Sequence, residues 1–246
     1  SNTAFRGFGA PQAMFVFEAA IRTAARRLGV RPEVLQRRNL LGEGDVFHYG
    51  MRADRVRARA CWDELDRLHP LTVARRDADA WNASGPRVRR GIAVVPVCFG
   101  ISFTAILLNQ AEALVHVYAD GSVGVSTGAV EMGQGVNEKI RRVVARTLGI
   151  DEAGVRVTST NTSRVANVSA TAASTGADLN GAAAREACLR ILAGLEQVAD
   201  AGATGDAGAR RPWRDLVAEA YRRRLPLSAL AHYSTPGLWF DEVTNT

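Results

Sequence analysis

Three segments of the chain have compositions suited to binding an anionic or a flat ligand. The first runs from Phe5 to Gln12, where two phenylalanines flank Arg6 and two glycines allow backbone conformations that other residues resist. Pro11 then opens a helical pattern, and the N–H groups and dipole at a helix N-terminus favour a phosphate or an oxyanion. The alternative is structural: both phenylalanines fill the core and Arg6 caps a neighbouring carbonyl.

The other two segments are also rich in small residues. In Glu131 to Gly135, glycines on both sides of Gln134 permit close approach of a ligand, and the amide can both donate and accept. The stretches 158–162 and 170–178 consist largely of Ser, Thr, Ala and Gly before a helix, a composition typical of anion-binding backbone. The alternatives are a tight connection with a solvent-facing Gln134, and a flexible Ser/Thr loop.

Composition excludes several classes of protein. The 246 residues are 47% hydrophobic, which is enough for a globular core, and the richest apolar stretch, 105–117, contains Asn109, Gln110 and Glu112, so we expect no membrane span. The start lacks a signal-peptide pattern, so we expect a cytoplasmic location. The net charge of +6 is scattered along helical segments, so we expect no nucleic-acid partner.

Common catalytic and metal motifs are missing as well. The sequence has no P-loop, HExxH, GxSxG or GxGxxG motif, and its four histidines lack ligand spacing. The three cysteines are odd in number and far apart, so we expect reduced thiols rather than a disulfide framework.

The elements that position these segments follow from periodicity and turn residues. Helices are expected over 11–28, after 31–33, and over 61–68, 136–148, 182–198 and 212–223. Extended segments are expected over 91–99, 113–118, 123–127, 155–160 and 227–233. The second and third of these flank Asp120-Gly121, which favours a hairpin with a type I′ turn. Residues 200–208 have the composition of a surface linker.

This order of elements predicts an α+β fold, with a layered mixed sheet and helices preceded by a mostly helical segment. The Ser-Gly-Pro sequence at 84–86 marks the change of pattern. We therefore expect two domain segments, 1–85 and 86–246.

Four ordered motifs resemble the molybdenum-binding subunit of xanthine dehydrogenase, in the xanthine oxidase or molybdenum hydroxylase family. They are 3–9 (TAFRGFG), 99–104 (FGISFT), 131–135 (EMGQG) and 171–181 (TAASTGADLNG). The resemblance covers essentially the whole chain. It implies a fragment of the family's two-domain molybdopterin-binding region, with 1–85 as the helical tail of the first domain and 86–246 as the start of the second.

The resemblance implies an oxidoreductase of purine catabolism that oxidises hypoxanthine or xanthine to uric acid with oxygen taken from water. The cofactor would be molybdenum–molybdopterin, and electrons would leave through iron–sulfur clusters and FAD, in partner domains or subunits, to NAD or oxygen. The alternatives within and outside the enzyme class are an aldehyde oxidase or other heterocycle hydroxylase, and a cofactor-binding module without catalysis. The parent is expected to be a dimer of heteromers.

The resemblance also implies roles for individual residues. Substrate contacts fall on the aromatic rings and one hydroxyl, namely Phe5, Phe8, Phe103 and Thr104. Cofactor contacts fall on Arg6, Met132, Gln134, Ala173 and Ser174, with Arg6 and Ala173 on the metal side. Two departures are mild, Ala10 for a usual Gly and Ala166 for a common Pro. The chain lacks the segments that carry the family's catalytic Glu and its purine-recognising Glu and Arg, so no catalytic residue is assigned and the fragment is expected to be inactive alone.

Overall fold

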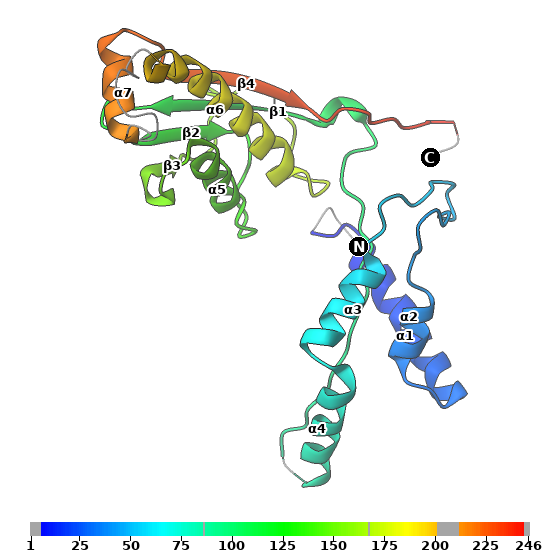
Figure 1. Cartoon of the computed structure of the whole chain (residues 1–246). Helices are drawn as coiled ribbons and strands as arrows, with labels where there is room; N and C mark the ends of the chain where they lie inside the picture. The colour runs from blue at the N-terminus through cyan, green and yellow to red at the C-terminus, as the bar shows by residue number, and fades with distance from the viewer. Residues whose placement is uncertain (1–5, 86, 167, 201–211, 244–246) are drawn as a thin grey trace. The chain divides into compact units, whose positions relative to one another are not determined.

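The computed structural model describes residues 6–85, 87–166, 168–200 and 212–243. It divides into two compact units, one of residues 1–99 with 241–246 and one of residues 100–240 (Figure 1). The linker predicted at 200–208 lies outside the described residues apart from its first position, which ends a helix.

Helices make up the ordered elements of the first unit. They are α1 (Ala10–Leu28), α2 (Pro32–Arg38), α3 (Ala58–Leu68) and α4 (Leu71–Ala83). A proline lies in the first turn of both α1 and α2, and Gly29 in the left-handed conformation ends α1. Arg75 of α4 makes a bidentate ion pair with Glu33 of α2 at 2.5 and 2.9 Å. The predicted helical segment is therefore confirmed.

The extended segment predicted over residues 91–99 is not a strand. None of its described backbone pairs with a neighbouring strand, and the carbonyl of Val94 instead accepts a hydrogen bond of 2.7 Å from the Gln36 side chain. Strand formation needs a partner as well as β-branched composition, so the prediction was wrong here.

A four-stranded mixed sheet forms the centre of the second unit. Its strands are β1 (Gln110–Val117), β2 (Val123–Thr127), β3 (Val155–Val157) and β4 (Ser228–Ser234), in the order β3-β2-β1-β4. β1 is antiparallel to both β2 and β4, whereas β2 and β3 are parallel. The ends of β2, β3 and β4 and the beginning of β1 therefore lie at one end of the sheet.

The turn between β1 and β2 differs from the predicted type. A type I′ turn needs positive φ at both central residues, but of Asp120 and Gly121 only Gly121 has it, at 85°. Tyr118 and Ser122 close the loop by backbone hydrogen bonding, and the Asp120 carboxylate accepts from the N–H and hydroxyl of Ser122. The result is a longer loop with glycine at the left-handed position.

Among the described residues of this unit, the α-helices are α5 (Val136–Leu148), α6 (Gly176–Asp200) and α7 (Trp213–Arg222). The bounds of α5 are those predicted, and α6 begins six residues before its predicted start. α5 and α6 pack together with the sheet, and their buried side chains, among them Ile140, Val144, Ala183 and Ala187, share one core with Ala113 and Val115 of β1 (Figure 1).

The α+β class, the mixed sheet and the preceding helical segment are thus confirmed. Within the described residues, no helix combines the length and apolar character needed to cross a bilayer.

Candidate functional site

Three loops of the second unit meet at the end of the sheet where β2 and β3 finish and β1 begins. They are residues 100–109 before β1, 128–135 between β2 and α5, and 158–175 between β3 and α6. Val130 N–H donates to the Thr171 hydroxyl at 2.9 Å, which joins the second loop to the third. Ser102 N–H donates to the Ala173 carbonyl at 3.1 Å, which joins the first to the third. The loops that contain three of the four sequence motifs are therefore linked by hydrogen bonds.

The loop before α5 contains a carboxylate, that of Glu131, which hydrogen-bonds to the backbone of the same loop. One carboxylate oxygen of Glu131 accepts from the N–H groups of Gly133 and Gly135, both at 2.9 Å, and the other accepts from Asn137 at 3.1 Å. These bonds to Asn137, Gly135 and Gly133 hold the pKa of Glu131 below its ordinary value. The carboxylate therefore occupies the place where an anion would bind at this helix N-terminus.

The Gln134 side chain folds back on the same loop. Its Oε1 accepts from Met132 N–H at 2.6 Å, and its Nε2 donates to the Val130 carbonyl at 2.8 Å. An amide has one further N–H and one further lone pair, so Gln134 keeps capacity for a ligand. Gln134 is half-buried, and the Met132 residue is 53% exposed.

The sequence of the loop before α6, residues 158–175, contains no Asp or Glu, and the first acidic residue after it is Asp178 in the first turn of the helix. Ala173 and Ser174 take successive left-handed conformations, with φ of 49° and 58°. Such backbone is uncommon outside glycine, and its strain concentrates at functional sites. Within the described part of the chain, the N–H groups of Ala173 and Ser174 donate no backbone hydrogen bond. These donors suit the oxygen atoms of an anionic group.

Phe103 and Thr104 lie in the loop before β1. Phe103 is half-buried and Thr104 is exposed. The buried Asn109 side chain binds the backbone of Phe103 on both sides, accepting from its N–H and donating to its carbonyl, each at 2.8 Å. The backbone of this candidate substrate contact is thus fixed to the start of β1.

The remaining predicted site residues belong to the first unit. Phe8 is 78% exposed and has φ of 41°, so it does not fill a core among the described residues as the structural alternative required. Arg6 is exposed beside it, and Phe5 lies outside the described residues. Ala10 N–H donates to the Gly7 carbonyl at 2.9 Å where the loop enters α1.

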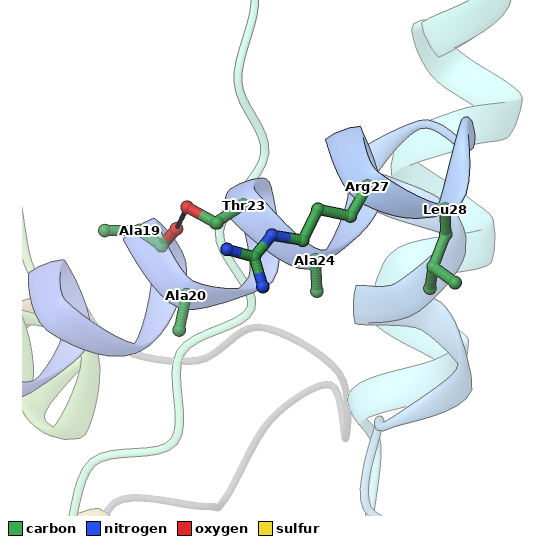
Figure 2. Close-up of a pocket in the computed structure, with 6 residues that line it drawn as sticks. All are labelled: Ala19, Ala20, Thr23, Ala24, Arg27 and Leu28. Carbon is green, nitrogen blue, oxygen red and sulfur yellow. Dashed lines mark hydrogen bonds between the residues drawn. The ribbon is translucent and has the colours of Figure 1, made fainter.

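One open hollow lies on a single face of α1. Ala19, Ala20, Thr23, Ala24, Arg27 and Leu28 line it, and the Thr23 hydroxyl donates to the Ala19 carbonyl at 2.8 Å (Figure 2). None of the predicted site residues lines this hollow. Among the described residues, no three His, Cys, Asp or Glu side chains are grouped to bind a metal ion.

These loops fit the molybdopterin group that the sequence motifs imply. The fit rests on the unengaged N–H donors before α6, which can bind phosphate or other oxygen atoms, and on the remaining capacity of the Gln134 amide. Ala173, Ser174 and Gln134 are the residues that would hold it.

Sequence reasoning missed two residues that shape these loops. Glu131 was part of a recognised motif but had no assigned role, although an acidic residue before a glycine-rich helix start is a capping signal. Asn109 carried no local signal, because its contacts exist only once the loop has closed.

Models of known protein families match two segments of the chain. Two models described as molybdopterin cofactor-binding domains match residues 1–40 and 69–246. Xanthine dehydrogenase/oxidase of Gallus gallus is 40% identical over 245 residues, which are 100% of this chain and 18% of that protein. Xanthine dehydrogenase of Oryza sativa subsp. japonica is 42% identical over 244 residues, 99% of this chain and 17% of that protein. The chain therefore spans less than a fifth of these relatives.

Solved structures show the same fold. Aldehyde oxidoreductase from Desulfovibrio gigas has a TM-score of 0.69 at 22% identity, covering 98% of this chain and 25% of that one. Quinoline 2-oxidoreductase from Pseudomonas putida 86 has a TM-score of 0.67 at 21% identity, covering 95% and 34%. Because the domain models match well over half of its residues, the chain belongs to the molybdopterin cofactor-binding domain family.

Proposed function

We propose that this chain is part of a molybdenum hydroxylase that oxidises hypoxanthine and xanthine to uric acid. The observation that carries the proposal is the loop before α6, with two left-handed residues and unengaged N–H groups, linked directly to the loop of Phe103. Identities of 38 to 42% with xanthine dehydrogenases along nearly the whole chain favour this substrate class.

The proposed roles divide between cofactor and substrate. Ala173 and Ser174 hold the molybdopterin through backbone N–H groups, and Gln134 holds it through its amide; Arg6 and Met132 are further cofactor contacts. When bound, this group supplies oxygen transfer from water and accepts two electrons from the substrate. Phe8 and Phe103 contact the two faces of the purine ring, Thr104 hydrogen-bonds it, and Phe5 is a further aromatic contact.

The proposal extends to the parent protein. In it, residues 1–85 would end the first molybdopterin-binding domain and residues 86–246 would begin the second. Iron–sulfur clusters and FAD in partner domains or subunits would carry electrons to NAD or oxygen, in a cytoplasmic dimer of heteromers. The catalytic carboxylate would lie in a part of the parent beyond this sequence.

The test is turnover by the full-length protein purified from its own host. Hypoxanthine, xanthine and a panel of aldehydes are offered with NAD, oxygen or an artificial acceptor, and urate formation is followed by absorbance. We expect purine oxidation to exceed aldehyde oxidation. Aldehyde oxidation alone would indicate an aldehyde oxidase, and no turnover by metal-loaded protein would indicate a binding module.

A further inference from the structure

Asn109 is a buried polar residue whose side chain hydrogen-bonds to the backbone of the loop that precedes it. The residue is only 2% exposed. Its Oδ1 accepts from Phe103 N–H at 2.8 Å, and its Nδ2 donates to the carbonyls of Phe103 at 2.8 Å and Ile106 at 3.2 Å. The amide thus pairs with both backbone groups of one residue, which requires a donor and an acceptor on a single short side chain.

The backbone of Asn109 is itself fixed to the sheet. Its N–H donates to the Ile106 carbonyl at 2.9 Å, and its carbonyl accepts from Thr235 N–H at 3.1 Å, immediately after β4. β1 begins at the next residue. The backbone of Asn109 is therefore held by β1 and by the end of β4. Its side-chain hydrogen bonds in turn hold the backbone of Phe103 in a fixed place relative to these strands.

Phe103 is also tied to the proposed cofactor loop through the residue before it. Ser102 has φ of 92°, a left-handed conformation that costs a non-glycine residue energy, and its N–H donates to Ala173 at 3.1 Å. Phe103 is therefore held between the sheet on one side and Ala173 on the other. Loss of either tie would change the distance of the aromatic ring from the cofactor loop.

We propose that Asn109 is a positioning residue that fixes Phe103 and thereby sets the preference for flat ring substrates over small non-aromatic ones. The inference rests on the proposed function, because it takes Phe103 as a ring contact. Only substrates that contact the aromatic face depend on its placement, since such a contact contributes a geometry-dependent preference.

Two variants and a matched control test the proposal in the full-length protein. Asn109→Ala removes both bonds to Phe103. Asn109→Asp keeps the shape and the acceptor but, when ionised, loses the donor. The control is Gln110→Ala, whose amide also donates to a carbonyl of this loop, that of Leu107 at 2.6 Å; its Oε1 pairs with His232 Nε2 at 2.8 Å rather than with the backbone of Phe103.

Two measurements are made on each protein after its molybdenum content is determined. The first is KM and kcat for a purine and for a small aliphatic aldehyde. The second is hydrogen–deuterium exchange of the peptide covering residues 99–105 in metal-free protein, which does not depend on turnover. For both Asn109 variants we expect KM for the purine to rise about two- to tenfold, with kinetics for the aldehyde changed less than twofold. Exchange at Phe103 should be at least about tenfold faster in Asn109→Ala, and Gln110→Ala should change neither result.

Each other outcome counts against one specific statement. Unchanged exchange at Phe103 in Asn109→Ala, or an equal rise in KM for both substrates, overturns the positioning role. An unchanged purine KM in an Asn109→Ala protein with normal metal content overturns it as well. Failure of the unsubstituted, metal-loaded protein to oxidise either substrate refutes the proposed function instead, and the exchange data then still report whether Asn109 holds the loop.

Discussion

The two long helices of the second unit begin in opposite ways. The N-terminus of α5 receives a carboxylate from its own loop, because Glu131 accepts from Gly133, Gly135 and Asn137. The loop before α6 supplies no carboxylate, although Asp178 lies in the first turn of the helix, and the two residues before Thr175 are held in left-handed backbone whose N–H groups make no hydrogen bond within the described structure. Where a carboxylate already accepts from the N–H groups of the preceding loop, those groups serve the fold, whereas strained backbone with unused N–H groups is available to a ligand.

The largest expected effect comes from adding to the loop before α6 a carboxylate like the one that Glu131 supplies before α5. Ser174→Asp places a carboxylate among the unengaged N–H groups, and aspartate tolerates the left-handed conformation. Repulsion between this charge and an anionic cofactor should lower pterin occupancy of the full-length protein at least about tenfold. Pterin released by denaturation measures it, and the neutral variant Ser174→Asn should retain its pterin. Full occupancy in Ser174→Asp would show that no anionic group binds at this helix start.

A smaller effect concerns the packing that brings the two loops together. A Cβ on Gly128, just after β2, would lie 2.2 Å from Cγ2 of Val168 in the loop before α6. Gly128→Ala should therefore destabilise this part of the unit by about 1 to 3 kcal/mol. Hydrogen exchange of β2 amides in the full-length protein measures the change. Gly154→Ala is the control, because a Cβ there meets nothing within 4 Å; equal effects of the two substitutions would contradict the packing account.

The smallest effect concerns the pH dependence of α5. Because backbone donors lower the pKa of Glu131, its stabilising contribution is complete above the ordinary carboxyl pKa and is lost as the pH falls through the lowered value. We expect the amides of Gly135 and Asn137 to lose exchange protection, relative to intrinsic rates, in that acid range. Glu131→Gln should remove this step and leave the amides near α6 unaffected. An acid transition identical in both proteins would assign it to another group.

The sequence predicted an element correctly where the residues that begin and end it agree with its apolar periodicity. Gly135 and Gly149 flank the apolar face of α5, and both adopt the left-handed conformation that ends a helical pattern, so its bounds were predicted correctly. The start of α6 was predicted too late, because Gly176 to Gly181 are mostly small residues without apolar periodicity. The 91–99 segment had strand composition but no partner strand, which local sequence does not reveal.

The segments that form the candidate site could be predicted from the sequence, but the hydrogen bonds that join them could not. The glycine-rich and small-residue motifs marked the loops, and the roles of Arg6, Phe8, Phe103, Thr104 and the cofactor contacts remain predictions. The bonds of Glu131 depend on the left-handed glycines around it, and those of Asn109 depend on a closed loop. For Glu131 the sequence offers only a capping signal, and for Asn109 it offers none, because the hydrogen bonds themselves arise from backbone geometry.

Molybdenum and pterin content per full-length chain, purified from its own host with sufficient molybdate, tests the central claim most directly. The account predicts about one molybdenum and one pterin per chain, since the loops at the end of the sheet offer one set of unengaged donors. A molybdenum and pterin content near zero under those conditions would contradict this expectation. The unengaged N–H donors before α6 would then have no ligand assigned to them.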